Sequence, residues 1–422
     1  MPFTSPRMVK ALIAISAVAI AAGAFAFWRS RPRPLRVGVL HSLTGTMSAS
    51  EVPVQQATLL AIDELNAQGG VLGRPVEAVL ADSASDGSTA LREAQRLIEQ
   101  ERISALFGCW TSACRRSVRP AVERGKIPYF YPLQYEGLED SPYIVHCGAT
   151  PNQQILPAVD WAMEHLGQRV FLVGSDYIFP RIANQLIRDH LEMVHGTVVG
   201  EAYLPLGATD VKAVVEQIAA VKPAVILNTI NGDTNAAFFR ALREAGITPE
   251  KIPAVSFSIA EAELQASGPR DFAGDYAAWS YFESLAGETN RAFVERFRRR
   301  FGAGRVTDDP MEAAYVGVHL WAQAVEAAGT DEAEPVLVAM RAQELTAPEG
   351  AVYVDPRNLH LWKTPRLGQI EPNGQFTVVW SDRQTPAVPF PLGRSKLEWA
   401  QLVEGLYKGW GNAWSAPLPV KP

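Results

Sequence analysis

The sequence lacks the residue patterns on which most catalytic and nucleotide-binding sites depend. It contains no Gly-x-Ser-x-Gly motif, no phosphate-binding loop and no Gly-x-Gly-x-x-Gly following a strand. Its three cysteines and seven histidines show no spacing typical of metal ligands. Basic residues are not in excess, and a net charge of −6 argues against nucleic acid as a partner. These absences favour a binding protein with no catalytic residue, no metal and no cofactor.

The odd number of cysteines leaves at least one of them without a partner in the chain. Cys109 and Cys114 lie close together across a predicted strand–helix turn, where a disulfide is possible but its geometry is awkward. We expect Cys109 to be a small buried apolar residue instead. Whether Cys109, Cys114 and Cys147 form any disulfide stays open.

The first 34 residues differ in character from the rest of the chain. Arg7 and Lys10 precede an uncharged apolar run over residues 11–27, and further arginines follow it at once. A basic start followed by an apolar run is typical of an export signal. Because the arginines after the run resist translocation, residues 1–34 are either a cleavable signal peptide or an uncleaved signal-anchor. We expect an exported protein, periplasmic or extracytoplasmic, with no lipidation cysteine near this segment.

Strand and helix patterns alternate from residue 35 onward, and the alternation restarts after Pro151. This rhythm implies parallel sheets with right-handed crossovers. Two such runs predict an α/β protein of two lobes, each a mostly parallel sheet flanked by helices, with a ligand cleft between them. The expected division is residues 35–148 and 278–345 for the first lobe, 149–277 and 346–391 for the second, and 392–422 for a Trp-rich C-terminal extension without a clear period.

The segment over residues 103–112 is the most informative part of the chain. Residues 103–107 are apolar enough for a strand covered on both faces, and Gly108 permits a sharp turn. Thr111 and Ser112 can cap the helix that follows. Open α/β sheets hold small ligands where the carboxyl end of a strand meets a helix N-terminus. Because the turn carries Trp110 and two hydroxyls but no charge, it predicts a site for something small, polar and neutral.

Several stretches resemble one protein family. The chain resembles the type I periplasmic solute-binding proteins of the branched-chain amino acid class, and within that class the branch that binds urea and short-chain amides. The Gly-Cys-Trp-Thr-Ser and Gln-Tyr-Glu-Gly pieces are the more specific ones, whereas the first two stretches are shared by the wider class. The matching stretches are residues 40–47, 69–73, 108–112, 131–137, 174–181, 228–233 and 309–315.

The resemblance implies that the ligand lies between the lobes. Two strand-end loops of the first lobe and the tyrosine of a Ser-Asp-Tyr motif in the second lobe would contact it. Carried over by position, these contacts are Trp110, Thr111, Ser112, Tyr131, Leu133, Gln134, Tyr135 and Tyr177, and from the same kind of loop we add Glu136 and Thr229.

The chemistry of urea fits these residue types. Urea is flat and neutral, with four N–H donors and one carbonyl. Glu136, Asp233 or Glu261 can accept from the N–H groups, while the hydroxyls of Thr111 and Ser112 can donate to the carbonyl. Aromatic side chains of the set would cover its faces. The strand-end loops lack an obvious cation for an α-carboxylate, which disfavours amino acids.

Three alternatives compete with an ABC transporter protein that delivers urea or a short amide to its permease. One is a membrane-tethered sensor of the same fold, which an uncleaved anchor would favour. Another is a protein that binds a branched-chain amino acid. An amide hydrolase is disfavoured, because Cys109 would be its only nucleophile near the cleft and no His or Lys has a recognisable spacing to activate it.

Overall fold

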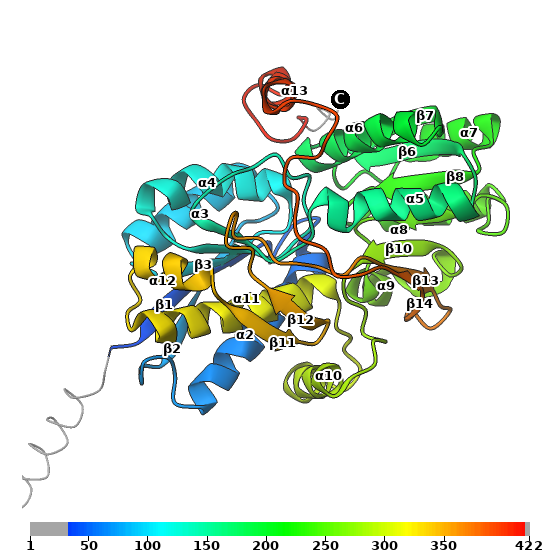
Figure 1. Ribbon diagram of the computed structural model, residues 1–422. Helices are drawn as coiled ribbons and strands as arrows, with labels where there is room; N and C mark the ends of the chain where they lie inside the picture. The colour runs from blue at the N-terminus through cyan, green and yellow to red at the C-terminus, as the bar shows by residue number, and fades with distance from the viewer. Residues whose placement is uncertain (1–32, 418–422) are drawn as a thin grey trace, which may run out of the picture.

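The computed structural model describes residues 33–417 and shows two α/β lobes side by side (Figure 1). Each lobe contains a mostly parallel sheet flanked by helices, so the predicted two-lobed fold is confirmed. The expected signal peptide or signal-anchor falls almost entirely on residues 1–32, outside the described residues. Within residues 33–417, none of the helices combines the length and apolar composition that crossing a membrane requires.

The sheet of the first lobe is parallel throughout. Its strand β1 lies inside the sheet between β2 and β3, and every residue of β1 except Arg36 is buried, as expected for a strand covered on both faces. In order across the sheet, the strands are β2 (Val76–Asp82), β1 (Leu35–His41), β3 (Ala105–Gly108), β4 (Tyr129–Tyr131) and β5 (Ile144–His146).

Helices cover both faces of this first sheet. The pair α3 and α4 lies on one side, and α2, α11 and α12 lie on the other (Figure 1). The bounds of the first-lobe helices are α2 (Ser48–Ala67), α3 (Gly87–Glu99), α4 (Ser112–Gly125), α10 (Glu288–Phe301), α11 (Asp309–Ala328) and α12 (Ala333–Met340).

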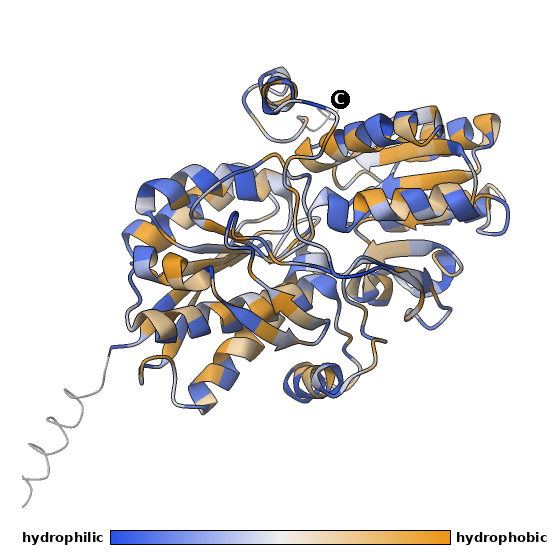
Figure 2. Ribbon diagram, viewed as in Figure 1, coloured by the Kyte–Doolittle hydropathy of each residue, from blue (hydrophilic) through white to orange (hydrophobic). Residues whose placement is uncertain are grey.

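The sheet of the second lobe is parallel at its centre, and its last two strands are antiparallel. Its central strands are strongly hydrophobic, whereas the helices around it alternate hydrophobic and hydrophilic residues (Figure 2). In order, the strands are β14 (Phe376–Ser381), β13 (Arg366–Ile370), β10 (Tyr276–Trp279), β9 (Ala254–Ser256), β8 (Val225–Thr229), β6 (Arg169–Ser175) and β7 (Thr197–Leu204).

Two separate apolar clusters fill the two faces of the second sheet. One lies under α7, α8 and α9, and the other lies under α5, α6 and the C-terminal helix α13. The bounds of these elements are α5 (Ile155–His165), α6 (Ile178–Met193), α7 (Lys212–Val221), α8 (Thr234–Glu244), α9 (Glu261–Ser267) and α13 (Lys396–Gly409), with the short turns η1 (Pro151–Gln153) and η2 (Pro269–Asp271).

The expected lobe boundaries are wrong at two places. The hairpin β11 (Glu344–Ala347) and β12 (Gly350–Tyr353) belongs with the first lobe, because Val352, Val354 and Leu361 lie in the apolar core of that lobe. We had assigned residues 346–391 to the second lobe as one block. Strand β10 is an interior strand of the second sheet, although the expected boundary at residue 278 divides it.

The C-terminal extension also differs from expectation. Residues 392–422 were expected to show no clear period, yet Lys396–Gly409 forms the helix α13. Ser395 caps this helix, and the Glu398 carboxylate accepts a hydrogen bond from the Ser395 backbone N–H. Trp399 is buried against the second lobe. The extension is therefore an ordered part of the molecule.

Candidate functional site

The turn from β3 into α4 has a geometry that only glycine allows. Gly108 has a φ of +139°, and a Cβ there would lie 1.9 Å from the carbonyl oxygen of Leu40. Cys109 follows with a φ of +58° and donates its backbone N–H to that same oxygen, at 2.8 Å. The Thr111 hydroxyl accepts from the backbone N–H of Cys114 at 3.1 Å, so the predicted helix cap is confirmed.

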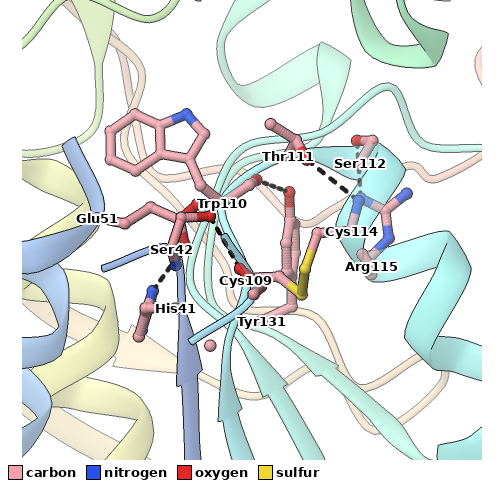
Figure 3. The surroundings of a disulfide bond; sticks show 12 residues. His41, Ser42, Glu51, Cys109, Trp110, Thr111, Ser112, Cys114, Arg115 and Tyr131 are labelled. Atoms are coloured by element: carbon pink, nitrogen blue, oxygen red, sulfur yellow. Dashed lines mark hydrogen bonds and ion pairs between the residues drawn. A yellow bond between two sulfur atoms is a disulfide. The ribbon is translucent and has the colours of Figure 1, made fainter. Parts of the chain in front are cut away.

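Cys109 and Cys114 form a disulfide, and the expectation that Cys109 is only a packing residue is wrong (Figure 3). The left-handed backbone at Cys109 reverses the chain, so that its sulfur lies over the first turn of α4. The two Cα atoms are 5.7 Å apart, within the usual range for a disulfide. The third cysteine, Cys147, is buried, and burial raises the pKa of its thiol to about 12.

A buried ion-pair network lies directly behind this turn. Arg115 contacts Glu136 at 3.2 Å and Glu139 at 3.3 Å, and Arg116 contacts Glu136 at 2.9 Å. Burial alone would lower the pKa of Arg115, but the charges of Glu139 and Glu136 outweigh burial and raise it. Burial likewise opposes ionisation of Glu139, yet Arg115 brings the pKa of that carboxyl below its ordinary value. Arg115 and Glu139 thus stabilise the charged forms of each other.

Two residues expected to contact the ligand are instead engaged by this network. The Ser112 hydroxyl donates to Glu136 at 2.5 Å and accepts from Arg115 at 2.8 Å. Both carboxylate oxygens of Glu136 have protein partners. Their roles in the structure are therefore to orient α4 and the loop after β4.

Trp110 and Tyr131 meet at the cleft side of the first lobe. The Tyr131 hydroxyl donates to the backbone carbonyl of Trp110 at 2.5 Å (Figure 3). On its other side, the Tyr131 ring lies 4.7 Å from the Arg115 guanidinium. Burial raises the pKa of Tyr131, so its phenol stays protonated. The aromatic wall is consequently held by both the turn and the ion-pair network.

The second lobe presents neutral groups at the lobe interface. Asn231, in the loop after β8, donates from its side chain to the Thr229 carbonyl at 3.2 Å, and its backbone N–H donates to the Ser175 hydroxyl at 3.0 Å. Tyr177 precedes α6 and is buried. Burial raises the pKa of Tyr177, and Tyr131 and Glu136 of the first lobe raise it further across the cleft.

The lobes touch each other through side chains of this site. The Trp110 indole N–H donates to the Asn231 carbonyl oxygen at 3.2 Å. The Gln134 amide donates to the Phe257 backbone carbonyl at 2.7 Å. Both bonds join the first lobe to the second, so Trp110 and Gln134 lie at the surface where the lobes close.

Not all of the ten expected contacts lie together, although all ten are buried. Trp110, Gln134 and Tyr177 lie at the lobe interface with Tyr131. The Tyr135 hydroxyl bonds His360 at 2.5 Å, on the side of the first-lobe core. The Thr229 hydroxyl is bonded inside the second lobe, to Val173 and Asn184. Leu133 packs in the first core and Thr111 caps α4.

Other polar residues of the interface were not among the expected contacts. The side-chain oxygens of Gln134, Gln154 and Ser258 are buried and have no hydrogen-bond partner among the described residues. Gln134 and Gln154 both donate to the Phe257 carbonyl, which immediately precedes Ser258. Ser258 follows a predicted strand end, a signal that could have placed it in the set. No cluster of potential metal ligands occurs in residues 33–417.

Comparisons with known proteins agree with this architecture. The Leu/Ile/Val-binding protein homolog 6 of Brucella melitensis is 25% identical over 302 residues, covering 70% of this chain and 77% of that protein. A solute-binding protein of an ABC transporter from R. palustris, in complex with 4-hydroxybenzoate, superposes with a TM-score of 0.76 at 24% identity, covering 84% of this chain and 98% of that one.

A further structure superposes nearly as well, and a family profile covers most of the sequence. The isoleucine complex of a branched-chain amino acid transporter substrate-binding protein from Streptococcus pneumoniae gives a TM-score of 0.73 at 20% identity, with coverages of 84% and 100%. The profile of the periplasmic binding protein domain matches residues 35–395. The chain therefore belongs to the periplasmic binding protein family, as the resemblance predicted.

Proposed function

We propose that this is an exported periplasmic protein that captures urea or a short-chain amide between its lobes and delivers it to an ABC permease. The observation that carries the proposal is the charge balance of the cleft. Trp110, Tyr131, Gln134 and Tyr177 are neutral, and the nearest buried cation, Arg115, is already paired with carboxylates. A neutral ligand fits such a wall without leaving any charge unpaired.

The same balance disfavours the ligands found in the similar structures. A benzoate or an amino acid brings a carboxylate, which needs a cation or several N–H donors once it is desolvated. Arg115 could serve only by giving up Glu136 or Glu139. Because breaking a buried ion pair costs about 3–5 kcal/mol, a carboxylate ligand would bind weakly here.

The polar atoms near Phe257 support a ligand rich in N–H groups. The oxygens of Gln134, Gln154 and Ser258 are acceptors that lack a partner in the protein. Buried acceptors of this kind favour a ligand that donates to them and disfavour one that does not. The Tyr177 phenol, kept protonated by its raised pKa, would donate to the ligand carbonyl.

The size of urea limits the affinity. At about −1.5 kcal/mol per heavy atom, four atoms give about −6 kcal/mol, or a Kd of roughly 40 μM. A larger amide with the same donor pattern could bind more tightly. The comparison of urea with acetamide and propionamide therefore reports how much space the closed cleft leaves.

Isothermal titration calorimetry of the purified protein tests the proposal. We expect heat of binding with urea or a short amide and none with leucine or 4-hydroxybenzoate. Strong binding of leucine without binding of urea or any amide would refute the specificity. Uptake of radiolabelled urea by cells that lack the gene tests the transport role, and we expect uptake to fall when the gene is deleted.

A pair of matched variants tests whether Tyr177 contacts the ligand. Tyr177→Phe removes one hydroxyl at the lobe interface, and Tyr276→Phe removes one from a partly buried tyrosine on β10. We expect Tyr177→Phe to weaken binding about tenfold, the loss of one hydrogen bond, with a melting temperature near that of the wild type. Tyr276→Phe should leave the Kd unchanged. Equal effects of the two variants would remove Tyr177 from the site.

A further inference from the structure

The C-terminal extension is anchored firmly on the second lobe. Arg394 forms an ion pair with Asp189 of α6, with contacts of 2.5 and 2.8 Å. Trp399, on the first turn of α13, is 1% exposed and packs in the apolar cluster that contains Ile178 and Phe179. In Figure 1, α13 lies beside α6 at the upper edge of the molecule. The base of the extension therefore moves with the second lobe.

Beyond α13 the chain pairs with the loop that carries Tyr177. The backbone N–H of Ile178 donates to the Trp414 carbonyl at 3.0 Å. The backbone N–H of Ala416 donates to the Asp176 carbonyl at 2.9 Å. Tyr177 and Ser415 form the β-bridge between these two bonds. The extension thus fixes the backbone on both sides of a residue that we place in the ligand site.

The same segment reaches the first lobe through one side chain. The Arg116 guanidinium lies 5.1 Å from the centre of the Trp414 ring, and the Tyr407 ring of α13 packs against Trp414 at 4.4 Å. Arg116 in turn bonds Glu136 of the buried network. A cavity of about 410 Å³ lies between this segment and α3 and α4, and Arg116 and Trp414 both line it.

We propose that residues 412–416 act as a latch that holds the two lobes closed and positions Tyr177, an inference that rests on the proposed capture of a ligand by lobe closure. Trp414 joins the lobes: its carbonyl binds the second lobe and its ring binds Arg116 of the first. Opening the cleft separates α4 from α6 and breaks the ring contact, while the backbone pairing moves with the second lobe. The latch therefore raises the population of the closed form, and with it the apparent affinity.

Two variants of the full chain and one control test the latch. Trp414→Ala removes the ring but keeps the backbone bridge, whereas a stop after Gly411 removes both. Leu397→Ala, an exposed position on α13, is the control. A partly buried cation–π contact predicts a Kd for urea or the best amide that is roughly five- to thirty-fold weaker in Trp414→Ala, with faster ligand release and an unchanged Kd in the control.

Hydrogen exchange of the Ile178 amide gives a readout that does not depend on the ligand. This amide should exchange faster in the truncated chain and as slowly as wild type in Trp414→Ala and in the control. Small-angle scattering of the truncated chain should show a larger radius of gyration. An unchanged Kd, Ile178 exchange rate and radius in the truncated chain would overturn the latch.

The failure of the proposed function can be told apart from the failure of the latch. If the wild-type protein binds neither urea nor any amide, the proposed specificity is wrong, and the latch is judged by scattering and by Ile178 exchange alone. A wider truncated molecule with a fast Ile178 amide then supports it, and a wild-type radius and exchange rate contradict it.

Discussion

In the first lobe, charged groups support the residues at the lobe interface, whereas in the second lobe neutral groups support them. Behind Trp110 and Tyr131, Arg115 is held by two carboxylates, and a disulfide crosses the turn. Behind Tyr177 and the loop after β8, amides and hydroxyls bond one another. Asn228 there donates to Asn235 at 3.0 Å and to Ser256 at 3.1 Å. Each wall is rigid, but by a different set of interactions.

Two buried glutamates, one in each lobe, have pKa values shifted in opposite directions. In the first lobe, Arg115 lowers the pKa of Glu139 and keeps it ionised. In the second lobe, burial raises the pKa of Glu263 to about 7, next to the carboxyl of Asp308, whose pKa is also raised. The Glu139 carboxylate has a guanidinium beside it that offsets its burial, whereas Glu263 has a second carboxyl beside it.

Among the variants considered, Arg115→Ala should reduce the stability of the protein most. In Arg115→Ala, Glu136 and Glu139 lose their shared partner while buried, and we expect stability to fall by about 3–5 kcal/mol. The control Arg124→Ala removes an exposed arginine of the same helix, which pairs with Glu99 at 3.5 Å, and should cost less than about 1 kcal/mol. Unfolding in guanidinium chloride measures both, because urea is the proposed ligand. Equal losses would mean that the buried network stabilises the protein no more than a surface ion pair does.

The pH dependence of the melting temperature tests whether the buried Glu263 of the second lobe is protonated. Glu263 has a folded pKa of about 7 against an ordinary 4.5, so the folded protein binds an extra proton between these values. Its contribution is fully present below pH 4.5 and is lost as the pH rises through 7, by at most about 3 kcal/mol. Glu263→Gln should flatten this decline of the melting temperature between pH 4.5 and 7.5. An unchanged slope in the variant would place the proton elsewhere, for example on Glu261 or Asp308.

Local sequence patterns predicted the fold and the turn of the site. Alternating strands and helices indicated two parallel sheets, and both are present. Gly108 and Thr111 were recognisable because a positive φ and a helix cap are local requirements that few residue types meet. The glycine turn after Ile370 likewise joins β13 and β14. These features depend on neighbours in the chain, so the sequence alone contains them.

Features that depend on distant partners could not be predicted. Arg115 looked like an ordinary helix residue, because its partners Glu136 and Glu139 become neighbours only when β4 pairs with β3. Helix α13 was also missed, although Ser395 and Glu398 carry a readable capping box.

Removing the Cys109–Cys114 disulfide tests how much this bond stabilises the protein. The bond closes a loop with a sequence separation of 5, and chain entropy predicts a stabilisation of about 2 kcal/mol. We expect the double variant Cys109→Ala/Cys114→Ala to lose that amount in guanidinium chloride unfolding. Dithiothreitol should destabilise the wild type but not the double variant. Titration of two extra thiols in reduced, unfolded wild type confirms the link, and their presence before reduction contradicts it.

The smallest loss of stability is expected when a neutral hydrogen bond of the second lobe is removed. Ser256→Ala removes the hydroxyl that accepts from Asn228, leaving one buried N–H without a partner while Asn235 keeps the other. We expect a loss of about 1 kcal/mol, because a neutral hydrogen bond contributes far less than a balanced buried ion pair. The matched measurement is guanidinium chloride unfolding of Ser256→Ala beside Arg115→Ala. If Ser256→Ala were as destabilising as Arg115→Ala, the buried ion pairs of the first lobe would not be stronger than the neutral hydrogen bonds of the second lobe, and the contrast between the lobes would be wrong.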